Sequence, residues 1–321
     1  MPKLRDVVSV DKSDGRLALS VGEREIAFSF DGDLAYRQGE EFVSDLSGGG
    51  LSRDLLISKY PALPIEHALK ELDEDGFLTE SPEVPPEGIT GRQLYREARR
   101  VYDAVMAEAA DIYPNQVSAK LLDDTVTRAE LIGYAIEYYH VVAFCPRVLA
   151  PGLSQADDYE AMMAFRRFYQ AEQNHDRMLL KSLSAVGIDP RVQALQPLPA
   201  TFSMMTSLGI YAYQFPLAMK AVLFVLEEPQ LEFNDAFLRN AKRLGLPQDF
   251  WKPINAHSDV NEDEDHEAIS LDLMSTVEYV GSDEAHEVLL RVADMCEHLV
   301  ATGHEVTEWY GGSEDVRLRV W

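Results

Sequence analysis

The feature that most constrains this chain is the recurrence of carboxylate and imidazole side chains within helical segments that are otherwise apolar. Glu137 lies in YAIEYYHVV, and Glu227 lies near the end of KAVLFVLEE. Between them, Glu172 and His175 form a Glu-x-x-His step. A buried carboxylate without a partner costs several kcal/mol, so each of these residues needs a cation or strong hydrogen bonds. One metal site shared by several helices would satisfy all of them.

Helical periodicity dominates residues 89–312 and predicts a mainly α-helical bundle of about seven helices. Apolar residues make up 46% of the chain, which is enough for a sizeable core. Two capping-box pairs, Thr90 with Gln93 and Thr127 with Glu130, are expected to begin two of the helices. The Glu-x-x-His step is expected inside one long helix over residues 157–187.

The first eighty residues follow a different pattern. Three short alternating or β-branched runs, separated by turn signals, predict a three-stranded meander. Short helices follow, and FLTE is expected to be a wing strand. We therefore expect a small α+β, winged-helix-like domain over residues 1–80. The Pro-rich, acidic residues 81–88 are expected to link it to the helical domain, residues 89–321.

The net charge and the hydropathy of the chain limit the kinds of partner that this protein could bind. The net charge of −26 disfavours nucleic acid, which needs a basic face, and also disfavours anionic membranes. No run of about twenty apolar residues predicts a membrane span. The two cysteines indicate no disulfide framework, and the N-terminus has no apolar signal core. We therefore expect a cytoplasmic protein.

The segment HSDVNEDEDHE adds further candidate ligands but raises a problem of spacing. His257 and His266 are nine residues apart, which is about 180° around a regular helix. Both can face one ion only if the helix is irregular, for instance at a π-bulge. Glu262 or Asp263 can instead pair with His266. In a third arrangement Asp259, Glu262 and His266 share a face, and His257 is not a ligand.

Residues 89–312 resemble the haem-oxygenase-like di-iron oxidases, also called iron-containing redox enzymes. EYYHVVAFCPRVLA and EQNHDRMLLKSLSAVGID carry the likeness. The resemblance implies a haem-oxygenase-like bundle, two iron ions and O₂ as co-substrate. The metal ligands that it implies are Glu137, Glu172, His175, Glu227, His257, Asp263 and His266. The interval between the two histidines is longer than in the family, so the choice among Asp259, Glu262 and Asp263 stays open. Glu228 is an alternate for Glu227. His140 forms a second Glu-x-x-His step with Glu137 and is an alternate ligand in a ferritin-like arrangement, although we expect it to be a core histidine.

Residues 2–80 resemble the peptide-binding chaperone of pyrroloquinoline quinone biosynthesis and the recognition elements of enzymes that modify ribosomal peptides. PKLRDVVSV, GRLALSVGEREIAFSF and LSRDLLISKYPALPIEHALKELDEDGFLTE carry this likeness. It implies that a leader peptide binds by adding a strand to an exposed sheet edge. A winged helix without a peptide ligand, or a purely structural cap, is the alternative.

Together these features predict an O₂-dependent non-haem di-iron oxidase or oxygenase that acts on a ribosomal peptide or a peptide-linked amino-acid residue. A homodimer and an external electron donor fit this interpretation. Two alternatives stay open. One is a metal-independent oxidase or hydrolase of the thiaminase-II or pyrroloquinoline quinone synthase type, for which Cys145 is the candidate nucleophile. Because Cys145 has no local base, we expect it to be a packing residue. The other is a non-catalytic, peptide-binding adaptor.

Overall fold

The computed structural model describes residues 1–5, 7–13, 16–22, 24–30, 32–81, 88–112, 116–156, 158–227, 231–263 and 269–320. Contacts divide the chain into two compact units: residues 1–94 with 277–285, and residues 95–276 with 286–321. Most of the expected linker lies outside the described residues. The predicted domain limits therefore remain a prediction.

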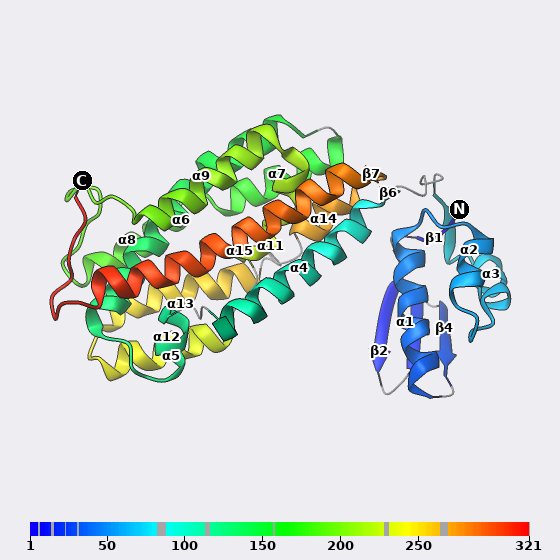
Figure 1. Ribbon diagram of the computed structural model, residues 1–321, viewed down its shortest axis with the longest axis horizontal. Coiled ribbons are helices and arrows are strands. Elements are labelled where there is room, and N and C mark those ends of the chain that lie inside the picture. Colours follow the sequence, from blue (N-terminus) through cyan, green and yellow to red (C-terminus); the bar gives the residue numbers. More distant parts are fainter. Residues whose placement is uncertain are drawn as a thin grey trace. The chain divides into compact units, whose positions relative to one another are not determined.

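The strands of the N-terminal unit form the expected meander (Figure 1). β3 (Arg16–Val21) lies between β2 (Ser9–Ser13) and β4 (Arg24–Ser29), and both pairings are antiparallel. β1 (Pro2–Leu4) pairs with β5 (Leu78–Glu80), which is the expected wing strand. The same unit also contains the short antiparallel pair β6 (Gly88–Ile89) and β7 (Val280–Gly281).

Three helices complete this unit: α1 (Asp33–Gly48), α2 (Arg53–Lys59) and α3 (Ile65–Glu74). Leu17 and Leu19 are two residues apart on β3, so their side chains lie on the same face of the sheet. Both are fully buried in the core of the unit, which also contains Leu46 of α1, Leu56 of α2 and Leu72 of α3.

The rest of the described chain is mainly helical, as predicted. Its helices are α4 (Gly91–Ile112), α5 (Gln116–Leu122), α6 (Arg128–Ser154), α7 (Tyr159–Ala171), α8 (His175–Ser184), α9 (Pro199–Gln214), α10 (Pro216–Val222), α11 (Phe224–Glu227), α12 (Leu231–Arg243), α13 (Gln248–Asp263), α14 (Ile269–Ser275) and α15 (Ser282–Tyr310). None of these described helices is long and apolar enough to cross a membrane.

The prediction of about seven helices is too low, because several segments expected to be continuous are interrupted. Pro216 ends one apolar segment and begins another instead of kinking a single helix, since proline offers no backbone N–H to the preceding turn. The capping boxes are confirmed. Thr127 accepts from the backbone N–H of Glu130, and the Glu130 carboxylate accepts from the N–H of Thr127 at the start of α6.

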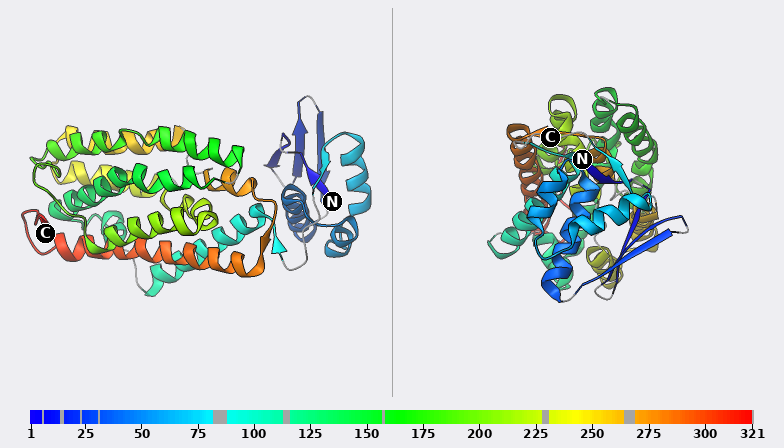
Figure 2. Two further views of the ribbon diagram at one scale, coloured as in Figure 1. Left: turned by 90° about the horizontal axis from the view of Figure 1, so that it is seen from above. Right: turned by 90° about the vertical axis from the view of Figure 1, so that its right-hand side faces the viewer.

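Helix α6 is the central element of the helical unit. It packs against α7, α8 and α9, and α8 packs in turn against α13. Figures 1 and 2 show α6, α9 and α15 running along the length of this unit. Residues 129–133 and 135–137 are all buried, so α6 is enclosed on every side there. Glu137 lies in this enclosed stretch.

Candidate metal centre

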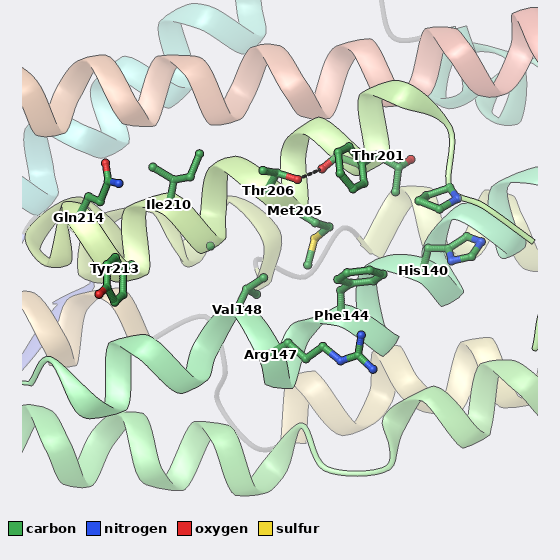
Figure 3. Close-up of a pocket in the computed structure, with 13 residues that line it drawn as sticks. His140, Phe144, Arg147, Val148, Thr201, Met205, Thr206, Ile210, Tyr213 and Gln214 are labelled. Carbon is green, nitrogen blue, oxygen red and sulfur yellow. Dashed lines mark hydrogen bonds between the residues drawn. The ribbon is translucent and has the colours of Figure 1, made fainter. Parts of the chain in front are cut away.

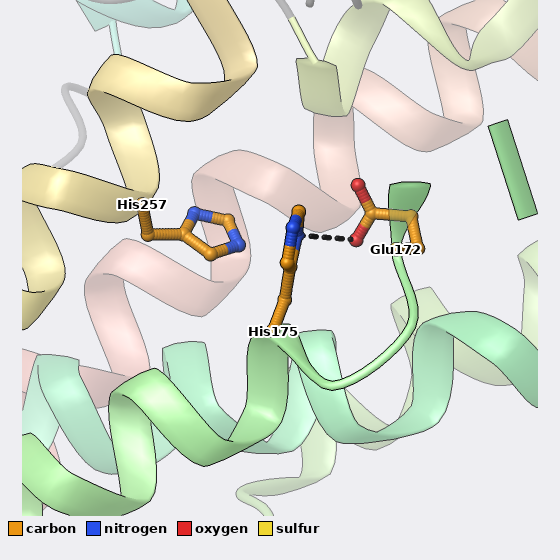
Figure 4. A group of neighbouring side chains, drawn as sticks. All are labelled: Glu172, His175 and His257. Atoms are coloured by element: carbon orange, nitrogen blue, oxygen red, sulfur yellow. Dashed lines mark ion pairs between the residues drawn. The ribbon is translucent and has the colours of Figure 1, made fainter. Parts of the chain in front are cut away.

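The end of α7, the start of α8 and helix α13 bring Glu172, His175 and His257 together. One potential ligand atom from each residue lies within 4.8 Å of the other two, and all three side chains are buried. Nδ1 of His175 is 3.4 Å from Oε2 of Glu172. The rings of His175 and His257 have centroids 4.8 Å apart and are nearly perpendicular, at 78°. Figure 4 shows His175 between the other two side chains.

The Glu-x-x-His step does not lie inside a helix, so the prediction of one long helix is wrong. Helix α7 ends at Ala171, and Glu172 is its C-cap residue. Asn174 then adopts a left-handed conformation, with φ of 74°, and α8 begins at His175. Asparagine tolerates this conformation better than most residues with a side chain. Glu172 and His175 therefore meet across a turn between two helices (Figure 4).

His257 is oriented by a tyrosine of the central helix. The hydroxyl of Tyr138 is 2.8 Å from Nδ1 of His257, and the two rings meet edge to face. The His257 ring points toward His175 (Figure 4). With Nδ1 engaged by Tyr138, the nitrogen that would bind a metal is Nε2. The sequence offered no signal for this contact.

Glu137, a predicted ligand, lies outside this group of three. Its carboxylate accepts hydrogen bonds from the backbone N–H of Leu198, at 2.9 Å, and from the hydroxyl of Tyr310, at 3.0 Å. Burial raises the pKa of Glu137, while these hydrogen bonds act in the opposite direction. These hydrogen-bond donors of the protein thus compensate part of the cost of burying the Glu137 carboxylate, for which the sequence alone suggested a cation.

The candidates of the segment HSDVNEDEDHE other than His257, together with Glu228, fall at or beyond the limits of the described residues. The backbone of α13 stays helical as far as Asp263, so Asp259, Glu262 and Asp263 lie on that helix, and their side chains are not described. His266 and Glu228 lie outside the described residues. The structure therefore brings His257 to Glu172 and His175 without testing the expected irregularity around NEDED.

A cavity of about 530 Å³ adjoins the candidate metal centre. Several predicted site residues share it, because Glu137, Glu172, Glu227 and His257 all line its wall. Cys145 lines it as well and is buried. Burial, followed by the carboxylates of Glu172 and Glu227, raises the pKa of the Cys145 thiol well above its usual range. A thiol that stays protonated is a poor nucleophile, which agrees with a packing role.

His140, an alternate ligand, lines a different cavity of about 390 Å³ between α6 and α9 (Figure 3). The close-up shows His140 at one end of this cavity and Tyr213 and Gln214 at the other. Burial, followed by the charge of Arg319, lowers the pKa of His140 to about 4. His140 is therefore a neutral side chain at physiological pH.

Residues 132–299, just over half of the chain, match the family described as iron-containing redox enzymes. The chain belongs to this family. The donors around His175 suit iron, because two imidazoles and one carboxylate form the ligand set of many non-haem Fe(II) enzymes. Glu172, His175 and His257 are thus a candidate iron site in an iron-containing redox enzyme.

Solved structures agree with this assignment at the level of the fold. A domain of unknown function with a haem-oxygenase-like fold from Shewanella denitrificans OS217 has a TM-score of 0.55 and 18% identity, covering 70% of this chain and 97% of that one. A TenA homologue from Pseudomonas syringae pv. tomato has a TM-score of 0.54 and 13% identity, covering 66% and 92%. This iron-containing redox enzyme therefore has a haem-oxygenase-like, mainly helical fold. No curated protein matches it significantly.

Proposed function

We propose that this iron-containing redox enzyme is an O₂-dependent non-haem di-iron oxidase or oxygenase. The observation that carries the proposal is the buried group of Glu172, His175 and His257 beside a mainly apolar cavity. Its one carboxylate and two imidazoles would hold one iron ion. When bound, iron would supply the means to reduce O₂ and to withdraw electrons from a substrate.

A second iron ion would need additional carboxylates. Glu137 and Glu227 line the same cavity as the group of three, and both are predicted ligands. We propose Asp263 and His266 as further ligands, with Asp259, Glu262 and Glu228 as alternates. The negative charge of these residues would offset the positive charge of two iron ions, which favours a dinuclear site over a single ion.

The surrounding residues would orient the ligands and keep water out. Tyr138 holds Nδ1 of His257 and so directs the other ring nitrogen toward His175. Tyr310 and the backbone of Leu198 hold the Glu137 carboxylate. Burial of these groups removes bulk water, which strengthens electrostatic interactions within the site.

We further propose that the substrate is a ribosomal peptide or a peptide-linked amino-acid residue, bound with help from the N-terminal unit. Within the described residues, β2 and β4 are the edge strands of the three-stranded sheet. An edge strand presents backbone groups that can pair with an added strand, which supports leader-peptide binding. We also propose that the protein forms a homodimer and that an external donor supplies its electrons.

Anaerobic titration with Fe(II), followed by exposure to O₂, tests the metal chemistry. We expect about two iron ions per chain and a transient visible absorption band after O₂ is added. His257→Ala should lose iron, whereas His286→Ala, which alters an exposed histidine of α15, should keep it. Fewer than one iron ion per chain at saturation, without a visible transient, would refute the proposal.

The metal-independent alternatives predict full activity after chelation, which the same preparations can test. One arrangement resembles a hydrolase triad but lacks its geometry. Ser207 Oγ is 3.0 Å from Nε2 of His298, and Oδ2 of Asp294 is 3.7 Å from the same nitrogen. In a Ser-His-Asp triad the carboxylate engages the other ring nitrogen, so this group does not support hydrolysis.

A further inference from the structure

We propose that the cavity beside the candidate metal centre binds an apolar, uncharged part of the substrate, either an aliphatic or an aromatic group. This inference rests on the proposed function, since it specifies the chemical class of group that reaches the same site. The cavity volume of about 530 Å³ lies within the range of small-molecule binding sites, roughly 300–1,000 Å³.

Apolar side chains form most of the cavity wall. They come from separate helices and include Val142 of α6, Leu208 of α9, Phe233 of α12 and Leu299 of α15. A ligand group that fills this space would transfer its surface from water to hydrocarbon. Such burial is worth about 0.8 kcal/mol per methylene, which corresponds to about fourfold in the dissociation constant.

The charges on the cavity wall disfavour an anionic group. Glu137, Glu172 and Glu227 are the charged residues that line the cavity in the described part of the chain, and all three are acidic. No lysine or arginine lines it there. The residues outside the described ranges include no lysine or arginine, so none of them supplies one. In the metal-free protein, an anion in this cavity would lie near acidic residues with no lysine or arginine on the described wall to offset its charge, at a substantial cost in free energy.

The wall carboxylates of Glu137 and Glu172 already interact with protein groups, and this disfavours a cationic substrate group as their partner. Glu137 accepts hydrogen bonds from Leu198 and Tyr310, and Glu172 contacts His175. In the proposed iron-loaded enzyme the metal ions would neutralise the remaining charge. The space next to the metal site is then left for a neutral group.

The chain-length dependence of binding tests this proposal on metal-free, full-length protein. Hexanol, octanol and decanol are titrated by calorimetry, with decanoate as the anionic counterpart of decanol. We expect the dissociation constant to fall by about fourfold for each added methylene. Decanoate should bind at least tenfold more weakly than decanol, because its carboxylate meets acidic residues.

A pair of substitutions on α15 locates the binding site. Leu299→Trp places a larger side chain in the cavity and should weaken decanol binding at least tenfold. Leu290→Trp is the matched control, because Leu290 is on the same helix, is 45% exposed and does not line the cavity. If Leu299→Trp does not fold, Phe233→Trp on α12 replaces it, since Phe233 also lines the cavity.

Three results would overturn the proposal: no dependence on chain length, decanoate binding as tightly as decanol, or unchanged decanol binding by the cavity-filling variant. Titrating Leu299→Trp and the parent protein with Fe(II) distinguishes failure of this cavity proposal from failure of the proposed function. Loss of decanol binding with iron uptake intact would support the cavity assignment. Failure of the parent protein to bind iron would refute the proposed function without affecting the alcohol titrations.

Discussion

The hydroxyl of Tyr138 lies 2.8 Å from Nδ1 of His257, which links the central helix to a candidate iron ligand 119 residues away in sequence. If His257 binds iron through Nε2, its Nδ1 carries the proton and donates it to the tyrosine oxygen. A partner of this kind fixes both the tautomer and the ring orientation of a metal-binding histidine.

Tyr138→Phe should therefore weaken iron binding without removing any ligand. We expect a loss of about 10- to 100-fold in affinity, the usual effect of deleting a hydrogen bond to a metal ligand. Anaerobic Fe(II) titration measures it. Tyr134→Phe is the matched control, because Tyr134 stacks on Tyr138, one turn away on the same helix. Equal iron affinity of Tyr138→Phe and the parent would contradict this role.

The left-handed Asn174 should control the distance between Glu172 and His175. Asn174→Gly should preserve iron binding, since glycine adopts positive φ freely. Asn174→Val should destabilise the fold by roughly 1–2 kcal/mol and weaken iron binding, because a β-branched residue resists this conformation. Denaturant unfolding and Fe(II) titration measure the two effects.

Ala194→Val provides the comparison for Asn174→Val. Ala194 also has a positive φ, of 54°, and it is exposed and does not line the metal-site cavity. This variant should lose stability without losing iron affinity. The proposed role of the turn would be wrong if Asn174→Val bound iron as tightly as the parent protein.

His140 should make stability depend on pH. Its pKa is about 4 in the folded protein, against 6.5 as its ordinary value, so between these values the unfolded chain binds a proton that the folded protein does not. The contribution is fully present above about pH 6.5 and is lost as the pH falls toward 4. It amounts to about 3 kcal/mol over this interval.

His140→Gln should remove this dependence, because glutamine does not titrate. Between pH 7 and pH 4.5 the variant should therefore lose less unfolding free energy than the parent, as measured by denaturant titration at each pH. His286→Gln, which alters an exposed histidine, should behave like the parent. Parallel pH profiles for the parent and His140→Gln would show that His140 does not couple to folding.

Neither cysteine should react with thiol reagents in the folded protein. Burial is the main cause that raises the pKa of Cys145 well above its usual range and that of Cys296 to about 12. With Ellman's reagent at pH 8 we expect negligible reaction of the native chain and two thiols after unfolding. A fast native thiol that disappears in Cys145→Ala would instead favour the nucleophilic, metal-independent alternative.

The members of the site could be predicted from the sequence because carboxylates and imidazoles are unusual in apolar helices. Glu172, His175 and His257 were all candidates, and the structure brings them together. Their arrangement could not be predicted. The break at Asn174 has no glycine or proline to mark it, and it falls within continuous helical periodicity.

The hydrogen-bond partners of Glu137 could not be predicted from the sequence either. Leu198 and Tyr310 are 61 and 173 residues away from it, and only the folded bundle places them at its carboxylate. The partners of His257 were equally hidden. Spacing relates His257 only to residues of its own helix, such as His266, whereas the structure brings it to Glu172 and His175 from the end of α7 and the start of α8.

The turn at Asn174 makes the contact between Glu172 and His175 a tertiary contact, although the residues are only three apart. Glu172 ends α7, which packs on α6 and α14, and His175 begins α8, which packs on α6 and α13. The packing of these helices therefore fixes the positions of the two side chains, and His257 joins them from α13 only in the assembled bundle. A metal ion held between them would bind the native state and not the unfolded chain, so the midpoint of unfolding would rise with the concentration of free iron.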